Sequence, residues 1–169
     1  MKTLALAMIL AAQASWPAQA QAPNPGSEGD SIETLTKALY QVISGPAGTR
    51  DWPRFRALFI EGARLIPVRV TAAGASPVVL TVEDYIARAG ANFEKAAFYE
   101  SEISRRVEAF GNIAHVFSTY ESRHAPGEKP FARGINSIQM VNDGKSWKVV
   151  TILWDAERQG LSLPEKYLK

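Results

Sequence analysis

The sequence predicts an α+β domain in which a curved, mainly antiparallel sheet wraps around three N-terminal helices. Apolar residues recur at helical spacing in several segments between residues 31 and 93. From Phe98 onward the pattern changes to the alternation of strands, and turn signals separate four long runs. Helices that come early and a strand meander that comes late favour one sheet packed against helices.

Two helices are expected at the start of the domain. Ser31 is a typical N-cap, and the apolar residues that follow it keep a helical spacing up to the stop signal Gly45-Pro46. Thr49 or Asp51 caps a short second helix, which has Pro53 in its first turn. The apolar stripes of both helices are typical of core packing.

A strand and a third helix follow. The run Ala63 to Val70 is expected to be a strand, and Pro67 indicates either an edge strand or a bulge there. Residues 71–76 form a small-residue loop, and residues 77–80 are expected to add a short strand. Thr81 and Asp84 resemble a capping box and predict a helix from Val82 to about Phe93.

The second half of the chain reads as two hairpins. Gly111-Asn112 joins the first pair of runs, and Asp143-Gly144 lies in the turn of the second pair, where glycine accepts a positive φ easily. Along the third run, Asn136 leads a face that continues with Ile138 and Met140. The four expected strands are 98–110, 113–123, 135–141 and 147–154.

The first 20 residues have the three parts of a secretory signal peptide. Lys2 is followed by an apolar run, and Ala18-Gln19-Ala20 supplies a small-residue cleavage site. Polar residues and Pro17 interrupt the ~20 apolar residues that a membrane span would need. We therefore expect a signal peptide at 1–20, a flexible leader at 21–30, one domain at 31–157 and a C-terminal tail at 158–169.

Composition excludes several classes of function. Without Lys2 the mature chain has 18 basic and 17 acidic residues, so nucleic acid is not an expected partner. The absence of cysteine excludes disulfides, thiolate catalysis and cysteine-ligated metal. Two histidines nine residues apart do not form a zinc pattern. We expect no metal, no cofactor and no membrane contact after cleavage, in a protein that is secreted, or periplasmic in a Gram-negative source.

The chain resembles the nuclear transport factor 2-like superfamily, also called SnoaL-like or cystatin-like cone folds, which includes ketosteroid isomerase. The resemblance covers residues 31–157, and its carriers include DWPRFRALF, TVEDYIARAGANF and RGINSIQMVNDGKSWKVVTILW. It implies a pocket between the concave sheet face and the helices, and a homodimer through the sheet. It does not imply one activity, because such a fold hosts enzymes and binding modules alike.

Placed on ketosteroid isomerase, the sequence matches that enzyme's polar pocket residues only in part. Tyr40 falls at the helix-one tyrosine, and Asn136 falls at the protonated aspartate, where an amide donates a similar hydrogen bond. The position of the base holds Ile66, which cannot carry a proton. Tyr40 and Asn136 either polarise a bound carbonyl or phenol, or are a core tyrosine and an amide with satisfied hydrogen bonds.

Other residues are candidates for the same pocket. His115 in mid-strand and Asp155 at the end of the last strand are the tentative catalytic bases. Met140 shares the face of Asn136, and Trp154 is a ligand contact or a core residue. His124, at a loop edge, is expected to be solvated.

The first hairpin is rich in charge. Arg123 and Arg133 could bind a ligand carboxylate as forks. The alternative, which we favour, is a ladder of exposed ion pairs across the hairpin, formed by Glu100, Glu102, Arg105, Arg106, Glu108, Glu121 and Arg123.

Three functions are compatible with the sequence. The first is a secreted protein that binds a small, largely apolar or aromatic ligand without transforming it. The second is a structural or interaction module that uses the open sheet face. The third is a cofactor-independent isomerase or dehydratase of SnoaL-like type, whose base would be His115 or Asp155.

Overall fold

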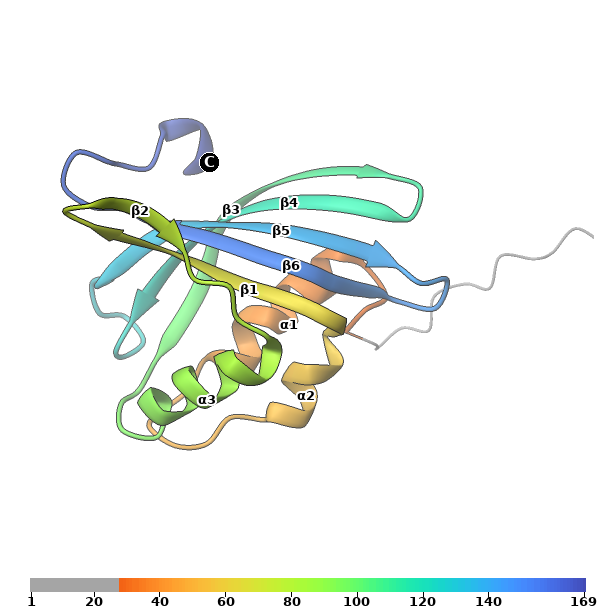
Figure 1. Cartoon of the computed structure of the whole chain (residues 1–169), viewed down its shortest axis with the longest axis horizontal. Helices are drawn as coiled ribbons and strands as arrows, with labels where there is room; N and C mark the ends of the chain where they lie inside the picture. The colour runs from red at the N-terminus through yellow and green to blue at the C-terminus, as the bar shows by residue number, and fades with distance from the viewer. Residues whose placement is uncertain (1–27) are drawn as a thin grey trace, which may run out of the picture.

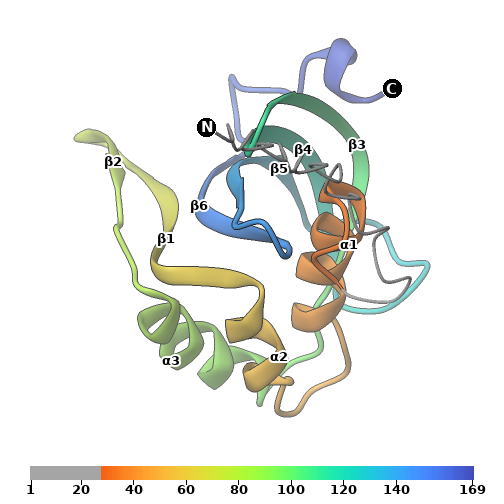
Figure 2. The same ribbon diagram turned by 90° about the vertical axis from the view of Figure 1, so that its right-hand side faces the viewer.

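The computed structural model describes residues 28–169. Three helices lie on one side of a six-stranded sheet (Figure 1), and the end view shows the sheet curving around them (Figure 2). The predicted α+β architecture is therefore confirmed. The expected signal peptide and the first part of the expected leader lie outside the described residues.

The helices begin where the capping signals predict. α1 (Ile32–Ile43) is capped by Ser31, whose side chain accepts from the Thr34 backbone N–H in a capping box. α2 (Trp52–Ala57) is capped by Asp51 rather than Thr49. α3 (Val82–Phe93) has the expected Thr81 and Asp84 box. Each cap satisfies backbone N–H groups that have no partner within the helix.

The sheet has the strand order β2-β1-β6-β5-β4-β3. All neighbours are antiparallel except β1 and β6, which are parallel. The four late strands β3 to β6 are the predicted meander. The strands are β1 (Phe59–Thr71), β2 (Gly74–Pro77), β3 (Tyr99–Phe110), β4 (Ile113–Arg123), β5 (Ala132–Asn142) and β6 (Trp147–Ala156).

The first strand differs from its prediction. β1 begins four residues earlier than expected, at Phe59, and lies between β2 and β6 rather than at an edge. Pro67 lies inside the sheet, where its carbonyl accepts from the Val78 N–H at 2.9 Å and it pairs with Trp154 of β6. The short strand β2 is the edge instead, formed by residues 74–77 rather than 77–80.

A bulge in β3 decides which charged side chains face the helices. Glu102 pairs with Tyr120, but the next pair is Ser104 with Thr119, so Ile103 is an extra residue. The bulge reverses the alternation of the strand. Glu100 and Glu102 therefore point to the concave face, whereas Arg106 and Glu108 point to the opposite, convex face.

The core lies between the concave sheet face and the helices. Val116, Ile138 and Val149 come from three adjacent strands and are at most 1% exposed, and Leu35 of α1 packs with them at 0%. Residues of α2 and α3, among them Phe55 and Phe93, belong to the same core cluster.

Both ends of the described chain lie against the domain. Glu28 pairs with Arg54, and the Gly29 carbonyl accepts from the Trp147 N–H at 2.8 Å, so the last residues of the expected leader contact the domain. The tail packs on the convex face (Figure 1), where the Thr119 hydroxyl donates to the Tyr167 carbonyl at 2.7 Å. No helix in residues 28–169 is long and apolar enough to cross a membrane.

Candidate functional site

A cavity of about 430 Å³ opens between the concave sheet face and the helices. Its volume lies within the ~300–1,000 Å³ that is usual for small-molecule sites. Aliphatic side chains from α1, α3 and the central strands form much of its wall, among them Leu39, Ile43, Leu65, Ala89, Ile138 and Ile152. The cavity therefore offers an apolar ligand a place away from water.

Aromatic rings complete the wall. Tyr85 of α3 stacks on Phe55 with ring centroids 5.3 Å apart and meets Trp154 edge to face at 6.4 Å. Phe93 and Phe98 form a second pair at 5.1 Å. All five rings line the cavity. Rings packed against one another in this way hold the shape of the cavity with little rotational freedom.

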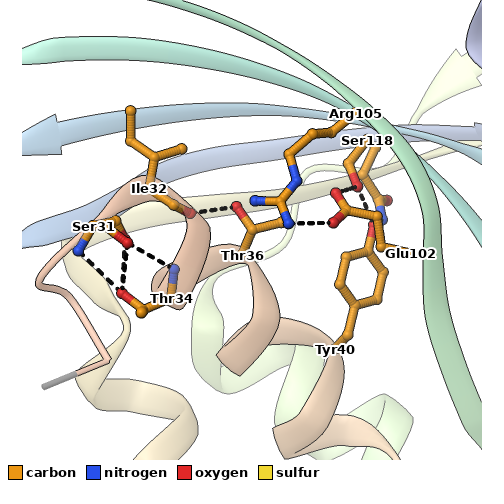
Figure 3. Close-up of polar contacts among 9 residues, drawn as sticks. Ser31, Ile32, Thr34, Thr36, Tyr40, Glu102, Arg105 and Ser118 are labelled. Carbon is orange, nitrogen blue, oxygen red and sulfur yellow. Dashed lines mark hydrogen bonds and ion pairs between the residues drawn. The ribbon is translucent and has the colours of Figure 1, made fainter. Parts of the chain in front are cut away.

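Tyr40 and Asn136 meet at one side of the cavity. The Asn136 side-chain N–H₂ donates to the Tyr40 hydroxyl at 3.1 Å, and that hydroxyl lies 2.6 Å from the Ser118 hydroxyl. Ser118 in turn donates to Glu102 at 2.5 Å, and Glu102 pairs with Arg105 at 2.9 Å (Figure 3). Residues from α1, β3, β4 and β5 are thus joined in one chain.

The direction of these hydrogen bonds fixes the role of Tyr40. Because the single proton of Ser118 goes to Glu102, Tyr40 donates its own proton to Ser118 and accepts from Asn136. Burial raises the pKa of Tyr40 further above its ordinary value. The tyrosine proton is therefore not free for a ligand carbonyl. This geometry agrees with the alternative that Tyr40 is a core tyrosine with satisfied hydrogen bonds. Asn136 still has one side-chain N–H and its side-chain carbonyl oxygen available for a ligand.

Glu100 supplies the carboxylate that lines the cavity. Its Oε2 accepts from the Ser122 hydroxyl at 2.9 Å, and Ser44 of the α1 cap clamps its backbone through two hydrogen bonds. The Glu100 side chain is half-buried, because one side of it faces the open cavity while protein atoms pack around the rest of its carboxyl group. Burial raises the pKa of Glu100 from its ordinary 4.5 to about 7, an effect that the Ser122 hydrogen bond only partly offsets.

Two further tyrosines face the same cavity. Within residues 28–169, the hydroxyls of Tyr85 and Tyr120 have no hydrogen-bond partner. Burial raises the pKa of both, and the charge of Glu100 raises each further, so Glu100 lies within electrostatic reach of both tyrosines. Gly134 makes room for Tyr120, because a Cβ at that position would lie 2.6 Å from the tyrosine oxygen.

The cavity rim carries a histidine that the sequence analysis assigned to solvent. His124 is exposed on one side, but its ring stacks on Phe131 at 4.3 Å, and both rings line the cavity. The prediction that His124 is merely solvated was incomplete, because Phe131 reaches it from the far end of the β4–β5 loop.

The two predicted bases are not in this cavity. His115 pairs with Gln139, and Asp155 pairs with Ile135, so both belong to the rows that point to the convex face, opposite Asn136. His115 bonds Ser137 at 3.0 Å, and Asp155 pairs with Arg158. Neither side chain can exchange a proton with a ligand beside Tyr40.

The predicted arginine forks are occupied by the protein's own carboxylates. Arg133 pairs with Glu157 through two hydrogen bonds of 2.8 and 3.2 Å, and Arg123 pairs with Glu121. The predicted ladder across the first hairpin does not form either. The ion pairs of this hairpin in residues 28–169 join residues of the same strand, and Glu100 points into the cavity instead.

The remaining candidates divide. Trp154 lines the cavity, and it pairs across the sheet with Asn136. Met140 is on the same face, but it is 2% exposed and packs in the core instead of lining the cavity. Residues 28–169 contain no group of three acidic or histidine side chains that could hold a metal ion.

Comparison with known proteins places the fold in a recognised class. No family model and no curated protein matches the sequence. Three solved structures each match 75% of this chain: a cystatin-like protein of Nostoc punctiforme (11% identity, TM-score 0.58, 88% of that chain), a nuclear transport factor 2-like protein of Pseudomonas putida (16%, 0.56, 84%) and another of Cytophaga hutchinsonii (16%, 0.57, 95%).

The chain therefore has the cone-shaped α+β fold of the nuclear transport factor 2-like and cystatin-like proteins. The resemblance inferred from sequence is confirmed at this level. At such low identity the match establishes the fold alone, and the Pseudomonas and Nostoc proteins are themselves described as of unknown function. The site must be argued from its own residues.

Proposed function

We propose that this protein binds a small, largely apolar molecule in the cavity of the cone. The observation that supports this proposal best is the cavity of about 430 Å³ with its aliphatic and aromatic wall. Few polar side chains line it, namely Tyr40, Tyr85, Asn92, Glu100, Tyr120, His124 and Asn136. A mostly apolar enclosure with a few placed polar groups is the usual form of a small-molecule site.

Blocking the cavity should abolish this binding. We expect Ala89→Trp to weaken the binding of 4-phenylbutan-1-ol, a neutral apolar probe, at least about tenfold, because the indole would occupy the cavity beside Tyr85. Ala87→Trp, on the exposed side of the same helix, should leave the affinity unchanged. Isothermal titration calorimetry measures both. Equal affinity of the two variants, or no binding to the wild type, would contradict the proposal.

The same cavity supports a second candidate, a cofactor-independent isomerase or dehydratase. His115 and Asp155 cannot serve it, but Glu100 can, since a carboxyl group with a pKa of about 7 is suited to exchange protons near neutral pH. Turnover of a carbonyl substrate that disappears in Glu100→Gln would favour this candidate over simple binding.

The third candidate, an interaction module, depends on the convex sheet face. The tail residues pack over part of that face: the ring of Tyr167 lies 5.0 Å from that of Phe117, and Arg106 donates to the Lys166 carbonyl. A second copy would have to displace this tail or meet the sheet beyond it. The homodimer stays a prediction.

Export belongs to the same proposal. A signal peptide at residues 1–20 places the mature protein in the periplasm of a Gram-negative source, or outside the cell otherwise. We expect exported material to begin with Gln21, as cleavage after Ala20 requires. N-terminal sequencing of protein from the host's envelope or medium tests this, and an intact Met1 on that material would refute secretory processing.

A further inference from the structure

The carboxylate of Glu100 is set into the cavity without a positive partner. The ion pairs found in residues 28–169 do not include it, although its neighbour Glu102 pairs with Arg105. Its side chain accepts one hydrogen bond, from Ser122, which leaves Oε1 without a protein donor and open to the cavity. A half-buried carboxylate with an unpaired oxygen gains from a cation that enters the cavity with a ligand.

The rest of the cavity also favours positive charge. In the described part of the chain no lysine or arginine lines it. Tyr85, Tyr120 and Trp154 present aromatic rings, whose faces carry the negative side of the ring quadrupole. A carboxylate among such rings attracts an ammonium group and repels an anionic ligand.

We infer that the ligand of this cavity is an apolar molecule that carries a protonated amine, with its ammonium group beside the Glu100 carboxylate and its apolar body against the aromatic wall. This inference rests on the proposed function, and it adds the chemical class of the ligand. The tyrosine hydroxyls of residues 85 and 120 and the carbonyl oxygen of Asn136 provide further acceptors for the N–H groups.

A neutral ligand makes less use of this site. An alcohol or ketone of the same shape gains the same apolar burial, but it leaves the charge of Glu100 uncompensated. The ammonium adds an ion pair and cation–π contacts in a desolvated place, where both are stronger than at an exposed surface. The head group therefore decides the affinity.

The inference also implies a pH dependence. Since the pKa of Glu100 is about 7, an ammonium binds the ionised form that prevails at higher pH, and its affinity falls as the pH drops below 7. The other groups that face Glu100 are the hydroxyls of Tyr40, Tyr85 and Tyr120, which remain protonated in this range because burial raises their pKa.

Other charges near the cavity are few. Glu102 is paired with Arg105, Arg50 lies over the Phe93 ring, and Asp155 acts on Tyr120 from the convex side, where it pairs with Arg158. At the rim, the His124 ring also lines the cavity, so the pH series is repeated with His124→Gln.

Three probes with one apolar body test the inference: 4-phenylbutylamine, 4-phenylbutan-1-ol and 4-phenylbutanoate. At pH 8, calorimetry with the wild-type protein should give an affinity for the amine at least about tenfold above that for the alcohol, and no binding of the carboxylate. Between pH 8 and 5.5 the preference for the amine should fall about tenfold, while the alcohol changes little.

The outcomes separate the two proposals. Equal affinity for amine and alcohol would overturn the amine inference and leave apolar binding intact, whereas failure of every probe to bind would overturn both. Glu100→Gln should lose the preference for the amine over the alcohol. Glu108→Gln, the same change on the convex face of β3, should behave as wild type. The wild-type pH series tests the amine inference without any variant. A preference for the amine that persists in Glu100→Gln would also refute the inference.

Discussion

Glu100→Gln is expected to stabilise the folded protein, relative to wild type, by roughly 3 kcal/mol more at pH 8 than at pH 4. In the unfolded chain the carboxyl group loses its proton near pH 4.5, but in the folded protein it keeps the proton up to about pH 7. Between these values the unfolded state is favoured progressively as the pH rises, and the lost stability is not regained above 7. Glutamine cannot ionise, so the variant avoids this loss.

Urea denaturation at several pH values measures the effect as a difference in the free energy of unfolding. The difference between Glu100→Gln and wild type should grow between about pH 4.5 and 7 and then stay constant. Glu108→Gln, which is exposed on the same strand, should show no such growth. A difference that is the same at all pH values would mean that Glu100 titrates as an ordinary surface carboxyl group.

This prediction bears on function as well as stability. Ionised Glu100 lowers the stability of the fold at neutral pH, and its one side-chain hydrogen bond, from Ser122, does not compensate for this cost. A purely structural role therefore does not explain a glutamate at this position. Sites for ligands often keep such unfavourable groups, and stabilising substitutions there tend to reduce function. If Glu100→Gln is more stable than wild type but no longer distinguishes amine from alcohol, Glu100 serves ligand binding at the expense of stability.

The arrangement of elements could be predicted because its signals are local. Caps at Ser31, Asp51 and Thr81 and the Asp143-Gly144 turn each depend on a few adjacent residues. The concave face of β5 also followed from simple alternation, which places Asn136 with Ile138 and Met140. The parallel pairing of β1 with β6 could not be predicted in this way, since those strands are far apart in the sequence.

The site could be predicted less well, because it depends on register. Glu100, Glu102, Arg106 and Glu108 alternate as if they shared one exposed face, but the bulge at Ile103 divides them between the two faces of the sheet. Isoleucine at position 103 is not a residue type that predicts a bulge. The contact of His124 with Phe131 likewise arises from the path of a loop.

Arg50 is a second residue whose importance only the structure reveals, and Arg50→Ala is expected to lower the free energy of unfolding by about 3–5 kcal/mol. The side chain is 8% exposed and donates to the carbonyls of Ile43, Gly45, Pro46 and Gly48 at 2.8 to 3.0 Å. It closes the connection between α1 and α2, where these carbonyls have left the helical pattern. Alanine would leave the carbonyls of Ile43, Pro46 and Gly48 without this donor, whereas the Gly45 carbonyl would keep the Phe98 N–H.

The fork of the guanidinium group explains why lysine should not replace it. Arg50→Lys keeps the charge, but one ammonium group cannot reach four carbonyls in different directions, so we expect it to restore less than half of the lost stability. Arg54→Ala is the matched control, since that arginine is about one-third exposed and should cost no more than about 1 kcal/mol. Full recovery in Arg50→Lys would show that charge, rather than the shape of the donor, holds this connection.

Because the guanidinium also lies 4.9 Å above the Phe93 ring, loss of Arg50 should loosen the aromatic wall and weaken 4-phenylbutylamine binding together with stability.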